Sequence, residues 1–113
     1  MPETVICIDP GHGYPDPGAV GPTKLAESDV VLDVAERVQK ILSATYPVVL
    51  TRSGRSAPGK NKSDTLKHKV QVAKDAEATI FVSIHCNAST NAAASGFEVL
   101  YDPDDAEGKI FAF

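Results

Sequence analysis

The chain has 113 residues, of which 42% are hydrophobic and 23% charged, and its formal net charge is −4. This composition is typical of one globular domain that can bury a core without a structural metal or disulfide bonds. The acidic balance argues against a nucleic-acid binder, and the sequence has no apolar run long enough for a membrane-spanning helix.

The first half of the chain predicts a strand, a helix and a second strand. Thr4–Asp9 is a short β-branched run that ends at a Pro-Gly pair, which is typical of a buried strand. A loop rich in glycine and proline follows over Gly11–Pro22. Ser28–Ala44 has apolar residues at helical spacing and predicts an amphipathic helix, and Val48–Thr51 predicts the next strand.

A second helix is predicted to run to about Ala76, with Ser63 or Asp64 as its N-terminal capping residue. Its inward face is expected to carry three apolar side chains, those of Leu66, Val70 and Ala73. A cluster of five lysines lies in and before this helix, and we interpret it as a solvated face: Lys60, Lys62, Lys67, Lys69 and Lys74.

The remaining sequence predicts two further strands. Thr79–Ile84 is a buried apolar run, and Phe97–Tyr101 alternates between apolar and polar residues after a polar loop over Cys86–Ser95. Residues from Ala106 to Phe113 have the beginning of a helical pattern. Alternating strands and helices predict a single α/β domain with a mostly parallel or mixed sheet flanked by helices.

Two histidines and a glutamate are predicted to meet at the carboxyl edge of this sheet. His12 follows the first predicted strand and His85 follows the third, and open α/β sheets bind ligands at this edge. Glu27 lies at the entry to the first helix, after the loop that carries His12. Two imidazoles and one carboxylate suit Zn²⁺ with a fourth position open, as in catalytic sites. The positions of these three residues in the sequence are also compatible with purely structural roles. For Glu27, the simpler interpretation is an acidic residue that the dipole of the helix favours at its N-terminus.

Two neighbouring polar residues are candidates for contacts with a ligand or a substrate. Asp9 ends the first strand and could orient a metal ligand, although it equally suits the cap of a turn. Asn87 lies two positions after His85 and could hydrogen-bond to a substrate amide, with a simple turn residue as the alternative.

Five short motifs occur in order along nearly the whole chain. They are IDPGHG at Ile8–Gly13, DPGA at Asp16–Ala19, VLTR at Val49–Arg52, FVSIHCNA at Phe81–Ala88 and GFEVLY at Gly96–Tyr101. Glu27 precedes the amphipathic helix between the second motif and the third. Taken together, these features resemble the zinc-dependent N-acetylmuramoyl-L-alanine amidases, which are peptidoglycan hydrolases of the bacterial cell wall.

The resemblance implies hydrolysis of the amide bond between N-acetylmuramic acid and the L-alanine of the stem peptide. It assigns zinc binding to His12, Glu27 and His85. It also implies a general-base glutamate beyond Phe113, so we expect residues 1–113 to be a zinc amidase catalytic domain without its C-terminal part. The activity of these residues alone is left open. The family usually has arginine where this chain has Lys69, and we expect this difference to alter a surface or substrate contact.

The sequence is also compatible with two alternative functions. One is an amidase-like module that binds peptidoglycan or a regulator without cleaving it. The other is a Cys–His hydrolase that uses Cys86, which is disfavoured because adjacent residues at a strand end tend to point apart.

The resemblance implies peptidoglycan as the partner, with neither nucleic acid nor membrane expected. We expect action outside the cytoplasm, at the cell wall, by secretion or by phage release, although Met1–Glu3 has no signal-peptide pattern. The sequence leaves open whether the protein is a host autolysin or a phage endolysin, and it gives neither the oligomeric state nor the stem-peptide preference.

Overall fold

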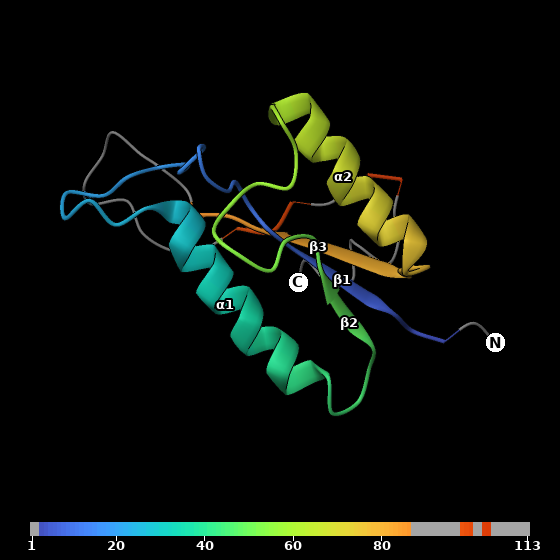
Figure 1. Cartoon of the computed structure of the whole chain (residues 1–113). Coiled ribbons are helices and arrows are strands. Elements are labelled where there is room, and N and C mark those ends of the chain that lie inside the picture. The colour runs from blue at the N-terminus through green and yellow to red at the C-terminus, as the bar shows by residue number, and fades with distance from the viewer. Residues whose placement is uncertain (1–2, 87–97, 101–102, 105–113) are drawn as a thin grey trace.

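The computed structural model describes residues 3–86, 98–100 and 103–104. In this part of the chain, a three-stranded parallel sheet is combined with two helices (Figure 1). The elements in chain order are β1 (Ile6–Pro10), α1 (Glu27–Leu42), β2 (Val48–Leu50), α2 (Lys62–Asp75) and β3 (Ile80–Ile84). The predicted α/β class is confirmed, and each of these elements overlaps a predicted range.

β1 is the central strand of the sheet, and all of its residues are buried. Ile6 lies opposite Val48 on β2 and opposite Ile80 on β3. Ile6 and Ile8 form the buried core together with Ala35 of α1. Because the strands are parallel, their carboxyl ends share one edge, and the chain leaves β1 and β3 from that edge.

The two helices lie on opposite sides of the sheet (Figure 1). The chain crosses from β1 to β2 in one direction and then from β2 past β1 to β3 in the other, and right-handed connections of this kind place successive helices on opposite faces. α1 buries Val31 and Ala35, as its periodicity predicts. It begins at Glu27 rather than at Ser28, so its N-terminus lies at the carboxyl edge of the strands.

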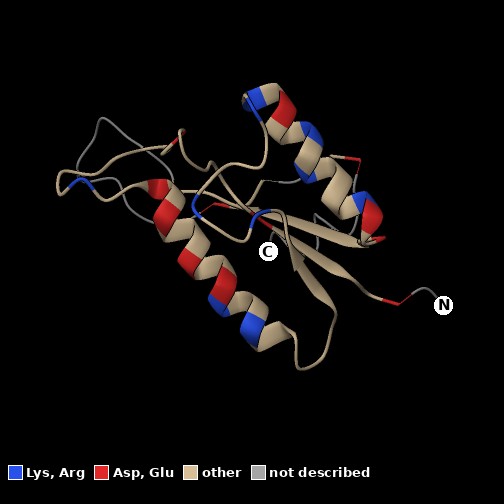
Figure 2. Cartoon of the chain, in the orientation of Figure 1, with Lys and Arg blue, Asp and Glu red and all other residues tan. Residues whose placement is uncertain are grey.

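α2 has a different inward face from the one predicted. Leu66 and Val70 are 63% and 51% exposed, whereas Lys69 is only 6% exposed. The interpretation of the lysine cluster as a solvated face is therefore wrong for Lys69. Because Lys69 is buried, the contact at the protein surface that we expected for it is wrong as well. Its ammonium lies 2.8 Å from Oδ1 of Asp9 in a buried ion pair. Elsewhere, α2 carries both basic and acidic residues, with an acidic residue near each end of the helix (Figure 2).

The N-terminus of α2 also differs from the prediction. The capping residue is Asn61, whose side chain accepts a hydrogen bond of 2.8 Å from the backbone N–H of Asp64. The predicted cap at Ser63 or Asp64 is therefore wrong, because both residues already lie inside the first helical turn.

The remaining predictions concern the C-terminal part of the chain. Residues 98–100 are described and are not in a strand, so the predicted strand is wrong there. Its other residues lie outside the described ranges, as do the loop after Cys86 and the helical pattern at 106–113. Neither of the helices in the described ranges has the length and apolar character needed to cross a membrane.

Candidate metal centre

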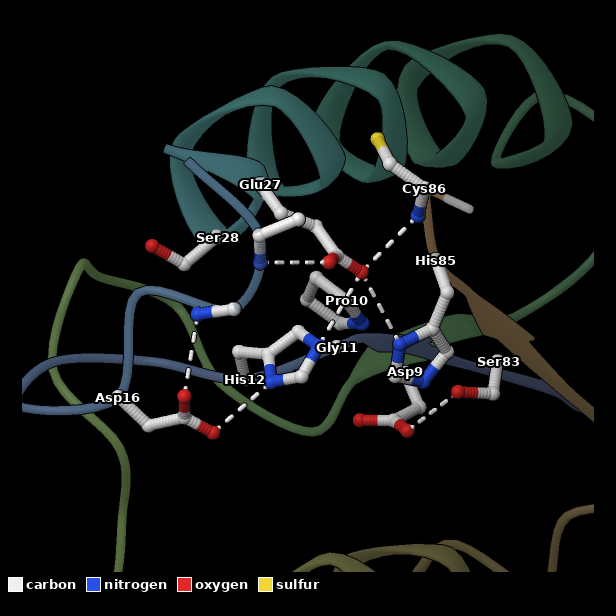
Figure 3. Close-up of polar contacts among 12 residues, drawn as sticks. Asp9, Pro10, Gly11, His12, Asp16, Glu27, Ser28, Ser83, His85 and Cys86 are labelled. Carbon is white, nitrogen blue, oxygen red and sulfur yellow. Dashed lines mark hydrogen bonds and ion pairs between the residues drawn. The ribbon is translucent and has the colours of Figure 1, made fainter. Parts of the chain in front are cut away.

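His12, Glu27 and His85 converge at the carboxyl edge of the sheet. His12 follows β1, Glu27 begins α1 and His85 follows β3. One potential ligand atom from each residue lies within 4.8 Å of those of the other two. Figure 3 shows both imidazole rings and the carboxylate turned toward one another. The convergence predicted from the order of the elements is therefore present.

One carboxylate oxygen of Glu27 lies between the two rings. Oε2 is 3.1 Å from Nε2 of His12 and 3.2 Å from Nδ1 of His85, and it accepts a hydrogen bond of 2.9 Å from the backbone N–H of Cys86. Oε1 accepts a hydrogen bond of 3.1 Å from the backbone N–H of Ala19. Two backbone donors therefore hold a buried carboxylate in a position that faces both imidazoles.

Glu27 is held in its charged form. Burial raises its pKa, but the hydrogen bonds from Ala19 and Cys86, the charge of His12 and the hydrogen bond with His85 outweigh burial, so the pKa lies below its ordinary value. A carboxylate that is already ionised at neutral pH can bind a cation without first losing a proton. The electrostatics thus agree with the geometry of a cation site.

Asp16 orients the ring of His12. Its Oδ2 lies 2.8 Å from Nδ1 of His12, and its Oδ1 accepts a hydrogen bond of 3.0 Å from the backbone N–H of Gly18. The hydrogen bond with His12 is the largest cause of a lowered pKa at Asp16. Because an ionised carboxylate only accepts hydrogen bonds, we assign a proton to Nδ1, which directs Nε2 toward Glu27 as the nitrogen available to a metal.

The sequence did not single out Asp16 as a site residue. It lies in the DPGA motif, between His12 and Glu27. This position was the feature of the sequence that could have indicated a role for Asp16 in the site. The contact could not be predicted from that place because it depends on how the loop turns back on itself. That turn is fixed by backbone hydrogen bonds in both directions between Gly13 and Asp16.

Two glycines allow the site residues to approach one another closely. A Cβ on Gly11 would overlap the ring of His85, and a Cβ on Gly18 would lie 2.6 Å from Cδ2 of His12 and 2.8 Å from Oε1 of Glu27. His12 itself has a φ of 63°, which is unfavourable for a residue with a side chain. Such a conformation persists where its surroundings hold it, here through the two carboxylates that face its ring.

Asp9 lies beneath the site and is engaged by three other side chains. Its Oδ1 accepts a hydrogen bond of 2.7 Å from Thr51 and lies 2.8 Å from Nζ of Lys69. Its Oδ2 accepts a hydrogen bond of 2.7 Å from Ser83. Burial raises the pKa of Asp9, but these hydrogen bonds and the charge of Lys69 outweigh it and lower the pKa. Asp9 thus joins β1 to the neighbouring strands and to α2.

Cys86 contributes its backbone to the site, and its thiol points elsewhere. Figure 3 shows its sulfur and the ring of His85 directed to different sides of the chain. Burial and the negative charge of Glu27 raise the pKa of the thiol, which disfavours the reactive thiolate. The geometry therefore does not favour a Cys–His hydrolase. Asn87 lies outside the described residues, and its predicted contact stays a prediction.

Two relatives share a large part of this sequence. An uncharacterized cell wall amidase of Bacillus anthracis is 47% identical over 98 residues, which cover 85% of this chain and 18% of the relative. The germination-specific N-acetylmuramoyl-L-alanine amidase of Bacillus subtilis (strain 168) is 37% identical over 117 residues, which cover 96% of this chain and 49% of the relative. The chain therefore spans less than half the length of these two proteins.

A solved structure and a family model that match this chain are also those of amidases. The structure of the CwlD amidase from Clostridioides difficile, in complex with the GerS lipoprotein, superposes with a TM-score of 0.88 at 28% identity, covering 97% of this chain and 61% of that chain. The family model described as N-acetylmuramoyl-L-alanine amidase, Amidase_3, matches residues 6–112. That range includes the His–Glu–His group and nearly all of the chain, and the chain therefore belongs to the N-acetylmuramoyl-L-alanine amidase family.

Proposed function

We propose that the chain binds one Zn²⁺ through His12, Glu27 and His85 and belongs to a peptidoglycan hydrolase. The bond cleaved would be the amide between N-acetylmuramic acid and the L-alanine of the stem peptide. The observation that carries this proposal is the convergence of the three ligand atoms within 4.8 Å, in a chain that matches the amidase family over residues 6–112.

The residues of the site fit Zn²⁺. Two imidazole nitrogens and one carboxylate oxygen are a ligand set of catalytic zinc sites, which keep a fourth position open. The side chain of His85 is 48% exposed, whereas that of Glu27 is 4% exposed, so the group is anchored on one side and open to solvent on the other. The carboxylates of Glu27 and Asp16 offset the charge of a divalent cation.

When bound, Zn²⁺ supplies a Lewis acid for the amide carbonyl and makes a nearby water more acidic. The chain's own residues prepare the site for this chemistry. Asp16 keeps a proton on Nδ1 of His12, and the backbone N–H of Cys86 holds Oε2 of Glu27 between the rings. The general-base glutamate expected beyond Phe113 stays a prediction.

The ligand assignment is tested by zinc stoichiometry and affinity. Metal-free chain, reloaded with zinc and dialysed, should contain about one zinc per molecule by elemental analysis. His85→Ala should lose most of this zinc. His68→Ala is the matched control, because His68 lies half-exposed on α2 and pairs with Asp64. Full zinc content and unchanged affinity in His85→Ala would show that the assignment is wrong.

The reaction is tested separately on purified peptidoglycan. Zinc-loaded protein that includes the expected general-base glutamate should release new L-alanine amino groups, and the release should stop when a chelator removes the metal. Sedimentation with peptidoglycan but no release of amines would favour the alternative of a binding or regulatory module. Comparison with His85→Ala distinguishes metal-dependent cleavage from contamination by another hydrolase.

We further propose that residues 1–113 form part of a zinc amidase catalytic domain that acts outside the cytoplasm. Support comes from the relatives, whose names describe cell wall and germination amidases. An autolysin and a phage endolysin would meet the same cell-wall polymer with the same chemistry. Hydrolysis of peptidoglycan by the whole protein is therefore the first property to measure, because both kinds of enzyme would share it.

A further inference from the structure

Arg52 is a buried cation whose hydrogen-bond partners are backbone carbonyls at the carboxyl edge of the sheet. It lies just after β2 and is 4% exposed. Its guanidinium donates four hydrogen bonds, to the carbonyl oxygens of Pro10 (3.2 Å), Gly11 (2.9 Å), Ser28 (2.8 Å) and Gly54 (2.8 Å). One side chain thus connects three separate segments of the chain.

Two of these carbonyls belong to residues next to the proposed zinc ligands. Gly11 immediately precedes His12, and Ser28 immediately follows Glu27. The same nitrogen of Arg52, Nη2, donates to both carbonyls. The loop after β1 and the first turn of α1 are therefore joined through a single atom, directly beside the residues that must meet at the metal.

The Gly11 peptide is also held from its other side. Its N–H donates a hydrogen bond of 3.0 Å to the carbonyl of Ile84, the residue before His85. The ring of His85 lies so close to Gly11 that a Cβ there would overlap it. A shift of the Gly11 peptide would therefore displace this ring. The hydrogen bonds of Arg52 and Ile84 together fix the backbone on which two of the three proposed ligands depend.

We infer that Arg52 is a positioning residue that sets the separation between His12 and Glu27 and thereby the affinity of the site for zinc. The inference rests on the proposed zinc site. A planar guanidinium suits this role because its five donors point in fixed directions, whereas a lysine ammonium is a compact donor on a flexible stem. Arg52→Lys keeps the charge and loses the planar array.

The test compares zinc affinity in Arg52→Lys and Arg52→Gln with that of the wild-type chain, by competition with a chromophoric chelator. Circular dichroism checks that each variant is folded. Losing an interaction that orients metal ligands typically weakens metal binding by about 10- to 100-fold, and we expect a loss in this range. Cobalt(II) loaded in place of zinc should give a changed ligand-field spectrum, which reports the geometry of the ligands.

Ile6→Val and Ile6→Ala are the matched controls. Ile6 is buried in the core at the start of β1, at the opposite end of that strand from the site, so these variants lose stability without touching the ligands. They should keep zinc affinity within about two-fold and leave the cobalt spectrum unchanged, because their contacts are remote from the metal.

Three results would overturn the inference. They are wild-type affinity and spectrum in both Arg52 variants, an equal loss of affinity in Ile6 variants of matched stability, and failure of both Arg52 variants to fold, which would make Arg52 a requirement of the fold alone. If the wild-type chain itself binds no zinc, the proposed function fails instead, so the two failures can be told apart.

Discussion

α1 and α2 flank the same central strand but bury different chemistry against it. α1 places Val31 and Ala35, which are 1% and 0% exposed, toward the apolar core. α2 buries Lys69, whose ammonium meets Asp9 beneath the candidate metal centre. Apolar contact therefore anchors one helix, and a buried ion pair anchors the other.

This difference shows where hydrophobic periodicity orients a helix and where it does not. On α1, the residues that repeat at helical spacing are also the buried ones. On α2, the same rule selected Leu66 and Val70, which are exposed, because the residue turned inward carries a charge. A buried charge requires a partner, and here the partner comes from β1, a segment distant in sequence.

The largest effect is expected from removing the charge that α2 buries. Lys69→Met keeps an unbranched side chain but leaves the carboxylate of Asp9 buried without its cation. Breaking a buried pair in this way typically costs about 3–5 kcal/mol of unfolding free energy. Lys67→Met, at an exposed position of the same helix, should cost less than about 0.5 kcal/mol. Urea denaturation measures both, and equal losses would mean that Lys69 does not anchor α2.

The same pair should make stability depend on pH in acid. The pKa of Asp9 is lowered in the folded chain, because its hydrogen bonds and Lys69 outweigh the effect of burial. Its charged form therefore stabilises the fold above the unfolded-state pKa of about 3.9, and this contribution is lost as pH falls through the lower folded-state pKa.

Asp9→Asn isolates this contribution, since the other carboxylates titrate in both proteins. The gap in unfolding free energy between the wild type and Asp9→Asn should be about 3–5 kcal/mol near neutral pH, because the variant leaves Lys69 unpaired. The gap should shrink progressively below about pH 4. Urea denaturation at a series of pH values measures it, and a gap that stays constant into acid would contradict the role of the ionised carboxylate.

The same contrast explains which parts of the fold and the site could be predicted. The β-branched run before His12 and the apolar spacing after Glu27 predicted a strand and a helix, and their order placed both residues with His85 at one edge. The contacts of Asp16 and Arg52 were not predicted. The sequence pattern does not distinguish a polar residue that is buried and hydrogen-bonded from one that is exposed to solvent. Their partners are set by the loop conformation and by the packing of separate segments, which periodicity does not describe.

A matched pair of valines tests the apolar side of the comparison. Val31→Ala removes two carbons from a side chain that is 1% exposed, and at about 0.8 kcal/mol for each buried carbon it should cost about 1.6 kcal/mol. Val70→Ala, at a position that is 51% exposed, should cost less than about 0.5 kcal/mol. Both changes alter helix propensity equally, so the difference in urea denaturation reports burial. Equal costs would show that the outer face of α2 is covered in solution.

The two helices also begin differently, and this contrast carries the smallest expected effect. α1 has no side-chain cap; its first amides, those of Glu27 and Ser28, donate to the carbonyls of Ala19 and Pro17 at 2.8 and 3.0 Å. These carbonyls belong to the loop that carries the site, so the start of α1 is tied to the metal centre. α2 begins at a side-chain cap, which a single substitution can remove.

Asn61→Ala should therefore loosen the first turn of α2 and leave the metal centre intact. The substitution removes the acceptor of the 2.8 Å hydrogen bond from the backbone N–H of Asp64, and losing such a cap typically costs about 1 kcal/mol of unfolding free energy. Asn61→Ser keeps an oxygen acceptor at the cap and should stay within a few tenths of a kcal/mol of the wild type. Urea denaturation measures the stabilities, and chelator competition should give wild-type zinc affinity for both variants. Equal stability of the alanine and serine variants would show that the cap does not hold this helix, and weakened zinc binding would show that the start of α2 is coupled to the site after all.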